Sequence, residues 1–182
     1  MKTATANLEN DHVHILRLID VMEQVTKKPE ANIEHLEKIV ELIRNFADGL
    51  HHNKEEKLLF PQMVEKGFSF QQGPIAVMMQ DHAQGRNFVK DMADNIALYK
   101  AGNTAVIPVI YSKMHGYIVL LRAHISKENN VLFQMADKVL SEEVQQSLLI
   151  EFKTMESKPV GSGSLADCIR QIESLAKAYN IQ

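Results

Sequence analysis

Apolar residues recur every three or four positions over most of the chain, which is the spacing of one face of an α-helix. A first helix is expected to begin near Asn7 to Asn10, where polar residues can cap it, and to end before Pro29. The same periodicity predicts helices over residues 32–66, 73–101, 105–140 and 141–157, then a short joint at 158–164 and a last amphipathic helix. The pattern predicts an all-α protein.

The first four predicted helices are long and are joined by short turns. This arrangement is typical of an up-down-up-down four-helix bundle. We expect residues 1–140 to form the bundle and residues 141–182 to form a C-terminal helical extension packed on it. Pro61 falls inside the second helix and should bend it or shift its register, because proline has no backbone N–H to donate.

The second and fourth predicted helices carry the same motif. The pattern H-x-x-K-E-x-x-x-L-F begins at His51 and again at His124. An Asp-His pair precedes each copy by about forty residues, at Asp11-His12 and at Asp81-His82. The chain therefore reads as two copies of one helical hairpin.

Each copy of the motif places a histidine and a glutamate four positions apart, on one face of the helix. That face is otherwise apolar, so a carboxylate buried there needs a compensating cation, and no Lys or Arg lies in the same row. A single pair of this kind is more often a buried hydrogen-bonded pair, but the repetition favours a metal ion. The predicted metal ligands are three from each half: His12, His51, Glu55, His82, His124 and Glu128.

Neighbouring residues of the motif are interpreted differently. His52 and Glu56 have the same spacing, but their row is polar, and we interpret them as a surface pair. Lys54 and Lys127 stand one residue before each candidate carboxylate, about 100° around the helix, where they would shape the surface or the local electrostatics.

Two further residues keep open roles. His14 lies at the boundary between polar and apolar faces and is an alternative ligand. Tyr117 lies seven residues before His124 on the same stripe and can line a small-ligand pocket, although a core tyrosine with a bonded hydroxyl is the simpler interpretation.

Composition narrows the classes of partner. With 182 residues and 45% apolar content, the chain can bury one core. Its net charge of −3 provides no basic surface for nucleic acid or for an anionic membrane, so neither partner is expected. The N-terminus lacks the pattern of a signal peptide, and the single Cys168 fits a reducing compartment. We expect a cytoplasmic protein.

Taken together, the motifs resemble the hemerythrin-like family, also called the HHE cation-binding domain. The residues that carry the resemblance span positions 8 to 140 and lie around the two H-x-x-K-E motifs and the two Asp-His pairs. The resemblance implies a four-helix bundle that holds two iron ions, with terminal histidines, two bridging glutamates and commonly an oxo or hydroxo bridge. Manganese or zinc are alternatives. The ligands that the family pattern gives are the same six that the helical rows select.

The sequence also departs from one branch of that family. Oxygen-carrying hemerythrins add a fifth histidine through an H-x-x-x-H pair on the third helix, and an aspartate five residues after the last histidine. Here Arg86 follows His82 by four residues and Asn129 follows His124 by five, so that ligand set is not reproduced. The six ligands look more like those of di-iron proteins that repair iron–sulfur clusters, whose usual cysteine-bearing N-terminal domain does not appear in this sequence.

Three functions follow as hypotheses. The leading one is a di-iron protein that binds, senses or detoxifies a small oxidant or diatomic molecule such as dioxygen, peroxide or nitric oxide. The second is a di-iron enzyme or an iron–sulfur-cluster repair protein. The third is a metal-stabilised structural or regulatory bundle, whose last two helices make contacts with a partner or with a second copy of the chain.

Overall fold

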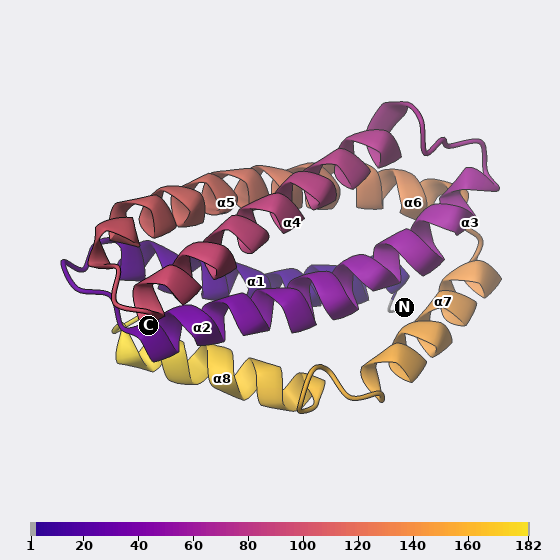
Figure 1. The fold of residues 1–182 in the computed structure, drawn as a ribbon. Helices are drawn as coiled ribbons and strands as arrows, with labels where there is room; N and C mark the ends of the chain where they lie inside the picture. Colours follow the sequence, from indigo (N-terminus) through magenta and orange to yellow (C-terminus); the bar gives the residue numbers. More distant parts are fainter. Residues whose placement is uncertain (1–2, 182) are drawn as a thin grey trace.

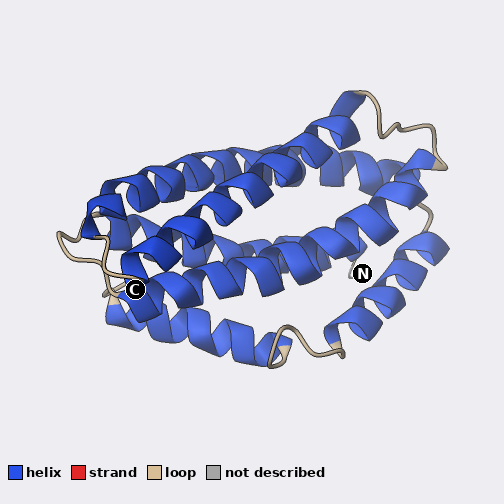
Figure 2. Cartoon of the chain, viewed as in Figure 1, coloured by secondary structure: helices blue, strands red, loops and turns tan. Residues whose placement is uncertain are grey.

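The computed structural model describes residues 3–181, and its regular structure is helical (Figures 1 and 2). Within those residues there is no β-strand, only an isolated bridge between Val160 and Gly163. The prediction of an all-α protein is confirmed.

Four long helical rods lie side by side, and the connections between consecutive rods alternate between the two ends of the molecule (Figure 1). Two rods are interrupted by π-helical segments. The first rod is α1, Ala4–Thr26, and the third is α4, Gly73–Lys100. The second consists of α2 Ile33–Leu42, η1 Ile43–His52, η2 Glu55–Leu59 and α3 Phe60–Val64. The fourth consists of η3 Thr104–Val106, α5 Ile107–Lys127, η4 Glu128–Leu132 and α6 Phe133–Val139.

The π-helical turns coincide with the repeated motif. The backbone N–H of Phe60 donates to the carbonyl of Glu55, and the N–H of Phe133 donates to the carbonyl of Glu128, each five residues back. Pro61 follows the first of these turns, as the expected change of register requires, but the second turn has no proline. The wider turn therefore belongs to the repeat, and such turns are frequent at functional sites.

The apolar core has two parts with a polar layer between them. One cluster includes Leu8, Leu59 and Leu132, and the other includes Ile15 and Leu50. In each rod the predicted metal ligands fall in the sequence between residues of these two clusters. The fold thus places the candidate site in the middle of the bundle, sealed by packed side chains above and below.

Two further helices pack on the outside of the rods. Helix α7, Glu142–Glu156, contacts α1 and η2, and helix α8, Leu165–Ala178, contacts α1 and α2. Ser141 caps α7 by accepting a hydrogen bond from the backbone N–H of Val144, as the sequence predicted. Ser164 and Asp167 form a reciprocal capping box at the start of α8.

One segment, Thr104–Val139, is long and apolar enough to cross a membrane by length and composition alone. A core helix of a protein outside membranes gives the same signal. This segment packs against α1 and α4 and carries His124 and Glu128.

Candidate metal centre

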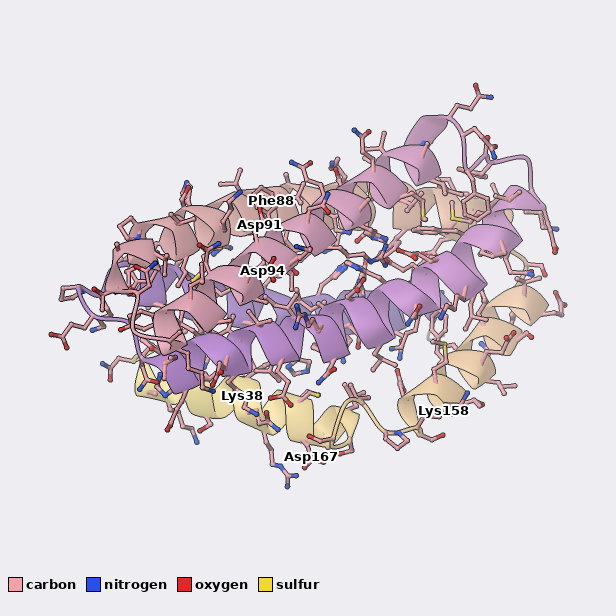
Figure 3. All side chains as sticks on the ribbon, in the orientation of Figure 1. Lys38, Phe88, Asp91, Asp94, Lys158 and Asp167 are labelled. Atoms are coloured by element: carbon pink, nitrogen blue, oxygen red, sulfur yellow. The ribbon has the colours of Figure 1, made fainter. Side chains whose placement is uncertain are left out.

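The six predicted ligands converge in the polar layer, and each is at most 1% exposed. They come from all four rods. Charged residues elsewhere on α4 are not enclosed. Asp94 is exposed, Asp91 is half-exposed, and both pair with surface lysines (Figure 3). Six buried polar side chains in one layer need a common compensating partner, because a buried charge or lone pair without one is costly.

The histidines meet in two pairs. The Nε2 atoms of His12 and His51 are 3.0 Å apart, and those of His82 and His124 are 3.2 Å apart. Each of these rings also directs its Nδ1 at a side-chain oxygen, so a neutral ring carries its proton on Nδ1 and presents a lone pair at Nε2. Two neutral rings that face each other in this way need a proton or a metal ion between their Nε2 atoms.

Each glutamate lies between the two halves. Glu55 has Oε1 3.7 Å from Nε2 of His51 and Oε2 3.5 Å from Nε2 of His82. Oε2 of Glu128 is 3.2 Å from Nε2 of both His12 and His124. Among the described residues, none of the four carboxylate oxygens has a hydrogen-bond partner. A carboxylate that faces one histidine from each half is in position to bridge two metal ions.

The Nδ1 partners explain the repeated aspartates of the sequence. Nδ1 of His51 lies 3.3 Å from Asp11, and Nδ1 of His124 lies 3.3 Å from Asp81. Metal-binding histidines usually donate the second ring N–H to such a carboxylate, which fixes the tautomer and raises the basicity of the ligating nitrogen. The sequence singled out both aspartates without giving them this role.

The other two histidines use partners from the opposite half. Nδ1 of His12 lies 2.7 Å from Oδ1 of Asn129, and Nδ1 of His82 lies 2.7 Å from Oε1 of Glu56. Asn129 and Glu56 occupy equivalent positions, five residues after the motif histidine. The outer contacts therefore obey the same internal symmetry as the predicted ligands.

The pKa values reflect this crowding. Burial lowers the pKa of His51 to about 4, so the ring is neutral and available as a ligand. Burial and the charge of Glu128 raise the pKa of Glu55 well above its usual value. Burial opposes the charged form of His124 as well, but Glu128 and Asp81 outweigh it and raise its pKa to about 9. Without a cation, the two buried glutamates cannot both be ionised.

The donor set fits a pair of divalent metal ions. Imidazole and carboxylate are borderline and hard ligands that suit iron, manganese or zinc, whereas a soft-metal site would use thiolate. The unpaired carboxylate oxygens and the facing Nε2 atoms both call for positive charge at the same place. The residues present therefore fit the metal that the resemblance implies.

Comparison with known proteins agrees with this geometry. The family model described as "Hemerythrin HHE cation binding domain" matches residues 3–136. The chain belongs to this family.

Curated relatives of this HHE-domain chain include the iron-sulfur cluster repair protein YtfE of Yersinia pestis (strain Pestoides F), which is 36% identical over 90 residues. The protein of the same name from Yersinia pseudotuberculosis serotype O:1b (strain IP 31758) matches equally well. The match covers 47% of this chain and 40% of each relative, so the chain spans less than half the length of these relatives. No solved structure gives a significant match.

His52 is not on the surface, and the expectation of a surface pair with Glu56 is wrong. The side chain is buried, its ring stacks on that of His82 with centroids 3.7 Å apart, and its Nδ1 lies 3.2 Å from Asp48. Glu56 contacts His82 and Arg86 instead. The interpretation of His52 assumed regular α-helical geometry. Residues 43–52 instead form the π-helical segment η1, and its wider turns change which residues share a face of the helix.

Lys54 is also buried, so of the two roles expected for it the structure supports the local electrostatics and not the surface. Its Nζ is fully enclosed and donates to Asn7 at 3.0 Å, to Asp11 at 2.8 Å and to Glu156 at 2.6 Å. The equivalent Lys127 is half-exposed and bonds Asp81. The two lysines thus differ because helix α7 covers only one of them.

A cavity of about 120 Å³ adjoins the site on the side of His82 and His124. Tyr117 lines it, as one of the two interpretations of that residue proposed, and Arg86 and the exposed Lys90 lie on its wall. His14, the alternative ligand, is half-exposed and lies in neither group of candidate metal ligands. Sequence reasoning missed His52, Asp48 and Arg86 at this end of the site, where the only signal was the His51-His52 doublet.

Proposed function

We propose that this HHE-domain protein is an up-down-up-down bundle that holds two iron ions and binds, senses or detoxifies a small oxidant or diatomic molecule. The observation that carries the proposal is the set of four buried carboxylate oxygens without hydrogen-bond partners among the described residues, facing four histidines. The alternating connections of the rods support the bundle topology. We infer a cytoplasmic location from the sequence features alone.

Two iron ions bound here would supply redox chemistry and exchangeable coordination positions. The chain itself binds them through Nε2 of its histidines and orients those rings through Nδ1. Asp11 and Asp81 hold the Nδ1 protons of His51 and His124. Carboxylate ligands from both halves keep the two positions close together, because each glutamate contacts histidines of both.

The size of the cavity favours a small ligand. A volume of about 120 Å³ accommodates a few water-sized molecules, since each occupies roughly 30 Å³ in the liquid. Burial raises the pKa of Tyr117, which lines the cavity, so its hydroxyl stays neutral. The flanking Gly85 and Val89 present little polar surface. Such a cavity accommodates dioxygen, nitric oxide or peroxide and is small beside the roughly 300–1,000 Å³ of pockets that bind drug-sized ligands.

Iron–sulfur-cluster repair is the second candidate. The observation that favours it is the similarity to the Yersinia proteins of that name, whose match covers 47% of this chain. On this hypothesis the same centre donates iron to a damaged cluster in a partner protein. The two functions share the metal site and differ in whether iron leaves it.

The metal site is tested by metal analysis of protein purified anaerobically with iron(II). We expect about two metal ions per chain in the wild type, and loss of loading in the double variant His51→Ala, His124→Ala. The matched control is His35→Ala, His115→Ala, which removes two histidines that lie outside both groups of candidate ligands. Undiminished loading of the first variant, or equal loss in the control, would refute the site.

The ligand is tested on the loaded protein by absorption spectroscopy during addition of dioxygen, peroxide or nitric oxide. A spectral response that is absent from the His51→Ala, His124→Ala variant supports binding or detoxification, and repeated turnover would identify an enzyme. Transfer of iron to a cluster-depleted acceptor protein, with no response to the three small molecules, would favour repair. Metal stabilisation with neither response would favour the structural bundle.

A further inference from the structure

A chain of charged side chains leads from His51 to helix α7. Nδ1 of His51 lies 3.3 Å from Oδ2 of Asp11, and the same oxygen accepts a hydrogen bond from Nζ of Lys54 at 2.8 Å. Lys54 also donates to Oδ1 of Asn7 at 3.0 Å and to Oε1 of Glu156 at 2.6 Å. A lysine ammonium has three N–H donors and no acceptor, so all of its hydrogen bonds are made here.

Helix α7 encloses this ammonium. Charged side chains are almost never fully buried unless they are paired, yet the side chain of Lys54 is 0% exposed. Its carboxylate partners Asp11 and Glu156 are only 4% and 20% exposed. The ring of Phe152 lies 5.6 Å from Nζ. Because Phe152 and Glu156 both belong to α7, this helix supplies the second carboxylate and also the apolar cover.

The other half of the site has no such enclosure. Lys127 also bonds Asp81, but it is 42% exposed, and Asp81 is its one carboxylate partner among the described residues. Asn7 lies four residues before Asp11, whereas the residue four before Asp81 is Val77, which is exposed. The repeat therefore supplies the lysine and the aspartate in both halves. The remaining two partners of the ammonium occur in one half only.

Helix α7 also lies outside the part of the chain that carries the ligands. The six predicted ligands belong to the four rods, and α7 begins at Glu142, beyond the end of the family match at residue 136. A helix that only covered apolar surface would need no carboxylate directed at a buried lysine. Glu156 therefore has a task that packing alone does not explain.

We propose that Glu156 and Lys54 are positioning residues of the metal centre. Glu156 holds the ammonium of Lys54 against Asp11, and Asp11 keeps the ring of His51 turned toward the metal. This inference rests on the proposed two-metal site and deepens it, because it makes the C-terminal extension part of that site. It also makes the reduction potential of the centre depend on the two charges of the pair.

The test is a redox titration of the iron-loaded full chain. Glu156→Gln removes one negative charge and keeps a side chain that can form hydrogen bonds, so the midpoint potential should rise, because nearby positive charge favours the reduced metal. Lys54→Met removes one positive charge and should lower the potential. The double variant has the net charge of the wild type and should return the potential most of the way to the wild-type value.

Opposite shifts distinguish this role from a structural one, because loss of packing alone would move the potential of both single variants in the same direction. The matched control is Glu151→Gln, which makes the same change of charge at an exposed position of α7 and should leave the potential unchanged. If Lys54→Met does not fold, the comparison of Glu156→Gln with Glu151→Gln decides.

Shifts of the same sign in Glu156→Gln and Lys54→Met would overturn the proposal. So would equal potentials in Glu156→Gln and Glu151→Gln. In either case, two iron ions per chain would leave the two-metal site intact. Fewer than two metal ions per wild-type chain would overturn the two-metal site and this proposal with it.

Discussion

Lys54 Nζ lies 2.6 Å from Oε1 of Glu156, and this ion pair connects helix α7 to the metal centre. The same ammonium group donates to Asp11, which in turn contacts Nδ1 of His51. Burial by itself would raise the pKa of Asp11, but the bonds from His51 and Lys54 outweigh it and lower that pKa. The C-terminal part of the chain thus stabilises the ionised carboxylate that orients a predicted ligand.

Replacing this lysine should therefore cost more than replacing its symmetric counterpart. Lys54→Met leaves Asp11 and Glu156 without their cation in a largely buried place, and loss of one member of such a pair costs about 3–5 kcal/mol. Lys127→Met removes a half-exposed partner of Asp81 and should cost under about 1 kcal/mol. Urea unfolding of both metal-free variants measures the difference. Equal losses of unfolding free energy in the two variants would show that the contacts with α7 do not make Lys54 more important than Lys127.

The two buried glutamates should make the stability of the metal-free protein depend on pH. Glu55 has a raised pKa because of burial and of Glu128, so the protonated carboxyl is favoured in the folded state. The stability that this proton contributes is present below the ordinary pKa of 4.5 and is lost as pH rises through the folded-state pKa. Metal-free Glu55→Gln should consequently be more stable than metal-free wild type at pH 8, by about 1–3 kcal/mol, and similar to it near pH 4.

The comparison variant for that measurement is Glu128→Gln. Burial opposes ionisation of Glu128 too, but His124 and His12 outweigh it and hold its pKa well below the usual value. This variant should therefore lose stability at pH 8 in the metal-free form. Metal ions should stabilise the wild type more than either variant, since each variant lacks one of the two carboxylates that we propose as metal ligands. An unchanged pH profile in Glu55→Gln would contradict the buried, protonated state of that residue.

Two glycines in the rods predict opposite effects of an added methyl group. A Cβ at Gly116 would lie 2.5 Å from the ring of Phe88, which is labelled on α4 in Figure 3, so Gly116→Ala should cost about 1–3 kcal/mol. A Cβ at Gly85 would lie 3.5 Å from Tyr117, an ordinary contact. Gly85→Ala should be neutral or stabilising by up to about 1 kcal/mol, because alanine favours helix. Thermal unfolding checks both, and a stabilised Gly116→Ala would contradict the close packing of α4 and α5.

Much of the site was predictable because its chemistry repeats. His12 and His82 could not be chosen singly, since each is a lone histidine on an apolar face, but the duplication selected both. His52 was misplaced because the row analysis assumed α-helical geometry through a π-helical segment. The local sequence contains no signal that predicts this π-helical segment.

The burial of Lys54 was not predictable for a different reason. Its burial depends on Glu156 and on the ring of Phe152, whose centroid lies 5.6 Å from Nζ, and both residues are about a hundred positions away in the chain. A periodic pattern in one helix carries no information about which remote helix will cover it. The long helices and their caps were predictable because they depend on local spacing, whereas the environment of this lysine depends on tertiary packing.

Arg86 provides the last prediction, because one guanidinium holds two carboxylates that orient histidines. Its Nε donates to Asp48 at 2.8 Å and its Nη2 donates to Glu56 at 2.7 Å, and these contact His52 and His82. Burial by itself would raise the pKa of Asp48, but His52 and Arg86 lower it to about 2. Arg86→Gln should raise that pKa and weaken metal binding by roughly tenfold, the lower end for lost outer contacts.

Arg122 is the matched control, because it is equally exposed at 40% and also bridges two carboxylates, Asp20 and Glu23, neither of which is a partner of a candidate ligand. Both substitutions remove a surface ion pair and should cost under about 1 kcal/mol of stability. Only Arg86→Gln should change metal affinity, measured by competition with a chelator. Equal metal affinity in the two variants would contradict a role for Arg86 in metal binding. It would mean that Asp48 and Glu56 orient His52 and His82 without the guanidinium.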